Sequence, residues 1–186
     1  MIELHCPDRL AMLRTLMTKQ TEKSSQNPIT TRRFCAIDLE NLALQPAVSP
    51  GAGRHIAYLL QDIFHLKPED LAVVAGGPHN AFAIDAVSKV LSGQSIWRGG
   101  HNGADLALIE ALDRIPSPTI SSPTHPVDEV IIGSGDGIFT SVVNRLQNRG
   151  LVVTCVAYSR ALHPALALAA NRVVRLDQFT QTQQAA

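Results

Sequence analysis

Residues 130–157 read VIIGSGDGIFTSVVNRLQNRGLVVTCVA, and this stretch decides the expected fold. Its two ends, 130–133 and 151–157, are short apolar runs rich in β-branched residues, which is typical of buried strands. The segment between them, 138–148, has helical periodicity and is closed by Gly150, a residue that commonly follows the end of a helix. Two buried strands joined by a helix form a parallel pair. The stretch therefore predicts one unit of a parallel α/β sheet.

The same alternation of short apolar runs and longer helical patterns extends over the chain from Arg33 onward. Further strands are expected at 34–39, 71–75, 95–97 and 173–176. Further helices are expected at 51–66, 81–91, 103–115 and 165–169. Buried strands that are each separated by a helix are typical of a sheet covered on both faces. The sequence therefore predicts an α/β fold, a three-layer α/β/α sandwich with a central parallel sheet.

Three segments depart from this pattern. The N-terminal segment combines an expected short amphipathic helix over 8–20 with the polar linker TEKSSQNPITT at 21–31. The segment PSPTISSPTHP at 116–126 holds four prolines and no periodicity, so a surface loop is expected there. We predict an N-terminal helix and linker over 1–31, one domain over 32–177 and a C-terminal tail over 178–186.

Composition limits the classes of protein to which the chain can belong. Its 186 residues suit one ordinary domain with an extension, and 45% hydrophobic against 17% charged residues is enough to bury a core. A wholly disordered or fibrous protein is thereby excluded. Sixteen basic residues balance sixteen acidic ones, so the overall charge identifies no partner. Any nucleic acid must be bound through local charge.

The cysteines and the hydropathy pattern favour a reducing, aqueous compartment. Cys6, Cys35 and Cys155 are odd in number, widely spaced and without metal-binding spacing, so no disulfide framework or structural zinc site is indicated. Cys35 and Cys155 lie in apolar runs and are expected to be buried free thiols. No apolar stretch reaches the roughly 18 residues needed to cross a bilayer, and no leader pattern begins the sequence. We expect a soluble, unprocessed, cytoplasmic chain without a membrane partner.

Three aspartates stand where strands of the expected sheet end. Asp38 closes the first strand, Asp136 follows the strand at 130–133, and Asp105 opens the helix at 103–115. In an open parallel sheet, ligands bind beyond the carboxyl ends of the strands. Each aspartate also has a purely structural interpretation, as a helix cap or as the centre of a buried turn.

The position of Asp105 on its helix can be derived from an advance of about 100° per residue. Leu108, Ile109 and Leu112 follow Asp105 at helical offsets, so the aspartate lies on the apolar, sheet-facing side. Glu110 points away from that side. Asp105 is therefore either a cap or part of a site at the edge of the sheet.

As a set, the three carboxylates would repel one another strongly if they converge on one crevice. A hard dication would neutralise them, and carboxylate oxygens are ligands that Mg²⁺ and Mn²⁺ prefer. Such an ion can activate water and stabilise the charge on a phosphate under in-line attack. The run Ser134-Gly135-Asp136-Gly137 adds exposed backbone N–H groups before a helix, a place suited to a phosphate oxygen.

Four segments in this order carry a resemblance to a known family: AIDLEN at 36–41, WRGGHNGADLALIEAL at 97–112, the stretch that begins at Val130, and AANRVVRL at 169–176. Over roughly residues 33–177 the chain resembles the NYN domains of the PIN-like nuclease superfamily. The resemblance implies a PIN-like sandwich and an endoribonuclease, dependent on Mg²⁺ or Mn²⁺, that cuts RNA with metal-activated water.

Carried over by position, the resemblance assigns roles to five residues. Asp38 and Asn41 match the D-x-x-N of the first strand, Asp105 matches the middle acid, and Ser134 with Asp136 matches an S-x-D. It implies that the three aspartates hold the ion and are catalytic. It also implies that Asn41 and Ser134 orient the ligands or bind the scissile phosphate. Because relatives of this superfamily often pair, a homodimer stays open beside a monomer.

Two departures from the family pattern reduce the number of acids. Members often carry an aspartate where this chain has Ile138, and many carry an acid where it has Ala111. Three carboxylates leave open a one-metal enzyme, a weakened enzyme, or a non-catalytic RNA-binding module on the same fold. A phosphatase of the haloacid dehalogenase type, suggested by DLE at 38–40 and GDG at 135–137, lacks the threonine and lysine motifs of that class.

Positive charge for RNA is expected from a window free of acids. Residues 137–176 contain no Asp or Glu but five arginines, namely Arg145, Arg149, Arg160, Arg172 and Arg175. Arg160 follows a strand end and is the preferred phosphate contact, and Arg98, after Trp97, is the second. Arg145 and Arg149 have the alternative of a solvated helix face. With so few aromatic residues, loose specificity is expected, and Trp97 is interpreted as a core residue or a subunit contact.

Overall fold

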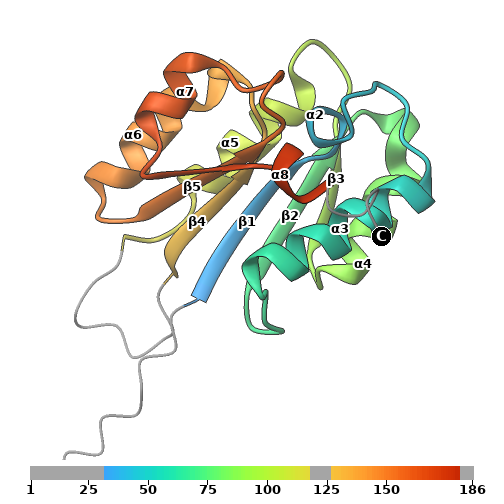
Figure 1. Ribbon diagram of the computed structural model, residues 1–186, viewed down its shortest axis with the longest axis horizontal. Helices are drawn as coiled ribbons and strands as arrows, with labels where there is room; N and C mark the ends of the chain where they lie inside the picture. The colour runs from blue at the N-terminus through green and yellow to red at the C-terminus, as the bar shows by residue number, and fades with distance from the viewer. Residues whose placement is uncertain (1–31, 118–126, 181–186) are drawn as a thin grey trace, which may run out of the picture. The chain divides into compact units, whose positions relative to one another are not determined.

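The computed structural model describes residues 32–117 and 127–180, which form a parallel sheet with helices on both faces (Figure 1). The strands are β1 Arg32–Asp38, β2 Leu71–Gly76, β3 Gln94–Trp97, β4 Val127–Gly133, β5 Val152–Ala157 and β6 Arg172–Arg175. The helices are α2 Leu39–Ala43, α3 Pro50–Phe64, α4 Ala81–Val90, α5 Gly103–Asp113, α6 Thr140–Asn148, α7 Pro164–Ala169 and α8 Asp177–Thr180, with 3₁₀ turns η1 Pro78–Asn80 and η2 Gly137–Phe139. The predicted three-layer α/β/α fold is confirmed.

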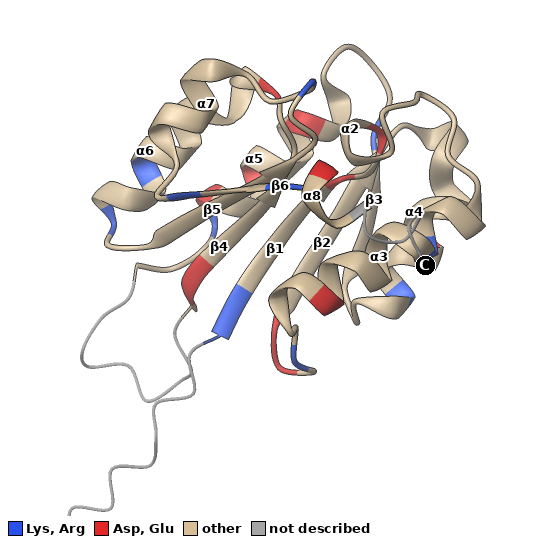
Figure 2. Ribbon diagram, viewed as in Figure 1, with Lys and Arg blue, Asp and Glu red and all other residues tan. Residues whose placement is uncertain are grey.

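The strand order β3-β2-β1-β4-β5-β6 places β1 and β4 side by side in the middle of the sheet. All neighbouring strands are parallel. At the starts of β1 and β4, where Figure 2 shows basic and acidic positions next to each other, Arg33 Nε donates to Glu129 Oε2 at 3.1 Å. The chain leaves β1 in one direction and returns to β4 on its other side, so a crevice forms where these two strands end.

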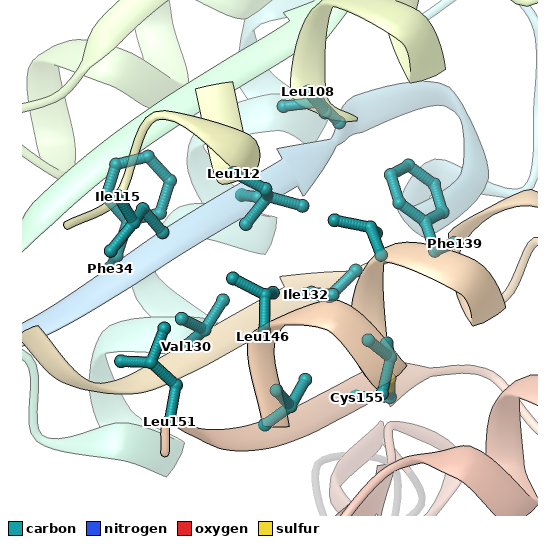
Figure 3. Packing of buried hydrophobic residues seen from close by; sticks show 14 of the residues in the cluster. Phe34, Leu108, Leu112, Ile115, Val130, Ile132, Phe139, Leu146, Leu151 and Cys155 are labelled. Carbon is teal, nitrogen blue, oxygen red and sulfur yellow. The ribbon is translucent and has the colours of Figure 1, made fainter. Parts of the chain in front are cut away.

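Two apolar clusters fill the space on either side of the sheet. One packs α5, α6 and α7 on one face and includes Phe34, Leu112, Phe139 and Leu146 (Figure 3). The other packs α2, α3 and α4 on the opposite face and includes Ile37. Alternate residues of each strand enter alternate clusters because side chains along a strand point to opposite faces. This explains why the strands read as continuous apolar runs.

The structure differs from the predicted elements mainly at short helices and at the ends of helices. The short helix α2 follows β1 directly, because Asp38 accepts the backbone N–H of Asn41 and caps it. The helix predicted from Ile138 begins with the turn η2. The helix predicted over 103–115 ends at Asp113, although Ile115 stays buried. Residue Asp177 starts the helix α8 at the border of the predicted tail.

Some of the sequence-based predictions concern residues that the structure does not describe. The N-terminal helix and linker over 1–31 lie outside the described residues, as does most of the proline-rich segment 116–126. Within the part that is described, Cys35 and Cys155 are buried free thiols, as expected. No helix in that part has the length and hydrophobicity to cross a bilayer.

Leu112→Ala should lower the free energy of unfolding by about 2–5 kcal/mol, because it leaves a cavity in the cluster between α5 and the sheet. Leu112 is fully buried, whereas Leu106 on the same helix is 43% exposed. Urea unfolding of Leu106→Ala is the matched control and should change stability by less than about 1 kcal/mol. Equal losses in the two variants would contradict the packing of α5 by this face.

Candidate active site

The crevice at the ends of β1 and β4 is an open cleft of about 580 Å³. Its walls come from the β1–α2 junction, the turn between β2 and α4, the loop between β3 and α5, and the turn after β4. Asp38, Asp105 and Asp136 all line it. The prediction that these three side chains share one crevice therefore agrees with the structure.

Asp38 is the most enclosed of the three acids, at 7% exposure. Its Oδ1 accepts the backbone N–H of Asn41 at 3.2 Å, and its Oδ2 accepts the hydroxyl of Ser134 at 3.1 Å. Burial raises the pKa of Asp38 to about 7, and the nearby charge of Asp105 adds to this, while the two hydrogen bonds act in the opposite direction. The ionised form of Asp38 therefore costs the folded chain free energy of desolvation.

Ser134 and Asn41 hold the turn after β4 against the end of β1. Ser134 is fully buried, and its hydroxyl also accepts the backbone N–H of Asp136 at 3.2 Å. The side-chain oxygen of Asn41 accepts the N–H of Gly135 at 2.8 Å. A Cβ on Gly135 would collide with the carbonyl oxygen of Ala161, so only glycine fits there. Of the two roles that the sequence leaves open for Asn41 and Ser134, these contacts favour orienting the carboxylates.

Asp105 lies in the first turn of α5 and is partly buried. Asn102 occupies the N-cap position of α5 without a side-chain cap bond, and the Asp105 carboxylate accepts its own backbone N–H in the first turn. Burial raises the pKa of Asp105, the charge of Asp136 raises it further, and a hydrogen bond with Asp38 opposes the shift. As the angular argument predicts, Leu108 is buried and Glu110 is exposed on the other side of the helix.

Asp136 is the exposed member of the set. It caps η2, with its Oδ1 accepting the N–H of Ile138 at 3.0 Å, so the structural role proposed for it also holds. The donor chemistry of three carboxylates fits a hard dication. Among the residues that the structure describes, however, no three His, Cys, Asp or Glu side chains already stand as a ligand set.

Glu40 is a fourth acid on the cleft wall that the sequence prediction missed. Its Oε1 accepts the N–H of Gly77 at 2.6 Å and the side-chain amide of Asn80 at 2.8 Å. Its charge contributes to the raised pKa of both Asp38 and Asp105. The only signal in the sequence is its position two residues after Asp38, and its role depends on the adjacency of β1 and β2.

The two arginines predicted to contact phosphate occupy different places. Arg98 lines the cleft and donates to Glu110 at 2.7 Å. Arg160 is exposed after β5, at the carboxyl end of the strand, but it does not line the cleft. Tyr158 lies near this guanidinium, whose charge opposes the burial that raises the pKa of the phenol.

The expected positive side of the molecule is partly neutralised by ion pairs. Arg145 forms a fork with Asp113, with a closest distance of 2.9 Å, which fits the alternative of a solvated helix face. Arg172 lies 3.8 Å from Glu129. Figure 2 shows these basic positions on α6 and β6 with acids on neighbouring elements.

Trp97 is 52% exposed, so its interpretation as a core residue is wrong.

The two positions that depart from the family pattern are partly buried and pack against the apolar cluster below α5 and α6. These are Ile138 and Ala111. Neither lines the cleft. The side chains that replace the expected acids therefore contribute to the core.

One family of PIN-like nuclease-type domains matches this chain, which is a parallel α/β/α sandwich with acids at its central crevice. The NYN domain family matches residues 75–177, more than half of the chain, and the protein belongs to this family. It therefore carries a nuclease-family domain, of a kind that generally uses divalent metals. The match begins at the end of β2, so β1 with Asp38 lies before it.

One solved structure extends the comparison of folds. The crystal structure of a protein of unknown function from Vibrio parahaemolyticus is similar to this chain with a TM-score of 0.56 and 17% sequence identity. The similarity covers 79% of this chain and 94% of the other, and it supports the fold alone. Among curated proteins, none matches the sequence.

Stability should fall between pH 5 and pH 8, and Asp38→Asn should remove much of that fall. A carboxyl whose pKa is raised in the folded state binds a proton that the unfolded state has released, so its cost grows above pH 4 and is complete above about pH 7. We expect Asp38→Asn to reduce the loss by about 2–3 kcal/mol in urea unfolding without metal. Asp62→Asn on α3, an exposed position, is the control. If the free energy of unfolding depends on pH in the same way in the wild type and in Asp38→Asn, the raised pKa of Asp38 is contradicted.

Proposed function

We propose that this protein is a metal-dependent endoribonuclease in which Asp38, Asp105 and Asp136 hold Mg²⁺ or Mn²⁺. The observation that supports the proposal is the meeting of three aspartates from separate segments in one cleft, where burial and mutual repulsion raise the pKa of two of them. A dication relieves this repulsion, because it favours the ionised form of every ligand.

The bound ion would supply activated water and neutralise negative charge on the phosphodiester. The residues of the chain then have separate tasks. Ser134 and Asn41 fix the orientation of Asp38 and of the turn that carries Asp136. Arg98, at the rim of the cleft, binds a phosphate oxygen after exchanging its ion pair with the exposed Glu110. Arg160 binds RNA beyond the cleft.

A non-catalytic RNA-binding module is the second candidate. Two observations favour it: the acids missing at Ile138 and Ala111, and the lack of a ready set of three ligands within the described residues. On this alternative, the cleft keeps the family's shape, and RNA binds without being cut and without any need for a metal.

Incubation of single-stranded RNA of mixed sequence with the purified protein and Mn²⁺ separates the two candidates. We expect cleavage that EDTA abolishes and that falls about a hundredfold or more in Asp136→Asn, because this change removes a ligand for the ion. Asp62→Asn carries the same substitution at an exposed position on α3 and should cut like the wild type.

A second readout does not depend on activity. Mn²⁺ should raise the melting temperature of the wild type and of Asp62→Asn more than that of Asp38→Asn, because an ion that binds only the folded chain stabilises it. RNA binding that resists EDTA, with no cleavage and no change of melting temperature on adding Mn²⁺, would decide for the non-catalytic module.

A further inference from the structure

A second, shallow groove of about 760 Å³ runs along the outer surface of α3 and α4. Its lining side chains recur at intervals of three or four residues on both helices, so each helix contributes one stripe. The residues that carry the argument are Arg54 and Tyr58 on α3, and Phe82, Asp85 and Lys89 on α4.

The groove exists because the two helices approach each other closely beneath it. A Cβ on Gly53 would lie 3.0 Å from Cγ2 of Val87 and 3.1 Å from the carbonyl oxygen of Ala83. The apolar sides of α3 and α4 are used in the cluster against the sheet. The outer stripes therefore flank a channel that residues 32–117 and 127–180 leave unfilled.

Two aromatic rings stand exposed in this groove. Phe82 is 83% exposed and Tyr58 is 54% exposed, although the whole chain has only five phenylalanines and two tyrosines. Exposed apolar surface costs free energy in proportion to its area, and exposed rings gathered in a concave site indicate a binding surface. Every nucleic-acid base has a face that can stack on such rings.

The charges of the groove suit a polyanion. Arg54 and Lys89 are exposed, and neither makes an ion pair with any residue that the structure describes. By contrast, Arg33, Arg98, Arg145 and Arg172 are all ion-paired. Asp85 is the single acid of the lining and is partly buried. A groove in which cations alternate with aromatic rings is typical of sites for single-stranded nucleic acid.

The groove begins beside the cleft of the candidate active site. Pro46 and His79 line the cleft, and Pro50 and Phe82, a few residues later on each side, line the groove. Both helices run away from the cleft from these points. From Pro50 to Gln61, eleven residues at a rise of about 1.5 Å each make a track of about 16 Å.

We propose that this groove binds single-stranded RNA that extends from the catalytic cleft, with bases stacked on Phe82 and Tyr58 and phosphates bound by Arg54 and Lys89. The inference rests on the proposed function in that it takes RNA as the ligand. It adds the path of the strand outside the cleft. Because stacking accepts every base, the track lengthens the bound segment without reading its sequence.

The test is binding of a fluorescein-labelled oligouridine of 12 nucleotides to the full chain in EDTA, measured by fluorescence anisotropy. Phe82→Ala should weaken binding about tenfold, and Phe82→Ala with Tyr58→Ala about a hundredfold. Arg54→Gln with Lys89→Gln should also weaken binding and should reduce its dependence on salt, because fewer counterions are released.

Matched controls lie on surfaces away from the groove. Leu168→Ala removes an apolar side chain that is 87% exposed on α7, and Arg114→Gln removes an exposed cation directly after α5. Both should bind like the wild type. Circular dichroism of each groove variant confirms that it is folded, and these substitutions at exposed positions leave both apolar clusters intact.

Failure of this inference can be told apart from failure of the proposed function. Wild-type affinity in the groove variants would overturn the inference, even if Mn²⁺-dependent cleavage is found. Binding that depends on the groove in a chain that never cleaves RNA would support the inference and leave the nuclease proposal refuted. If the aromatic variants change the mass in sedimentation and leave RNA binding unchanged, a second copy of the chain occupies the groove and the inference is overturned.

Discussion

The burial of Asp38 beside other carboxylates, at the carboxyl ends of β1 and β4, is the constraint on which the site depends. Asp38 is kept there by the hydroxyl of Ser134 and the N–H of Asn41. These bonds favour the charged form, but burial and the neighbouring acids outweigh them, since the pKa rises to about 7. A fold tolerates such a cost when the rest of the structure determines the conformation and the site gains a function from it. Protons or a cation are the two ways to relieve it.

Contacts at both ends of β1 and β4 fix the two strands against each other and so determine the conformation of the site. At the amino end, Arg33 pairs with Glu129 at 3.1 Å, and opposite charges meet. At the carboxyl end, Ser134 donates to Asp38, also at 3.1 Å. Ninety-six residues separate the partners in each case. Between these contacts the strands are apolar and buried on both faces, so the register that brings the first pair together also brings the second.

The sheet and the three aspartates could be predicted from the sequence because each depends on a local pattern and one general rule. Apolar runs separated by helical patterns indicate a covered parallel sheet, and strand ends in such a sheet share an edge. The contacts of Glu40 with Gly77 and Asn80 could not be predicted, since they need the adjacency of β1 and β2 and a helix of five residues without periodicity. The exposure of Trp97 was missed because β3 is an edge strand, which no local pattern reveals.

The acids that the family pattern leads one to expect at Ile138 and Ala111 are not replaced by Glu40. Its Oε1 is used by Gly77 and Asn80, so this carboxylate serves to hold the wall of the cleft together. It still contributes charge, because it helps to raise the pKa of Asp38 and Asp105. The cleft thus has four carboxyl groups on its walls but only three side chains placed as ligands in our proposal. In our proposal one dication shares the three aspartates, whereas a second would lack carboxylate ligands of its own, which favours a one-metal site.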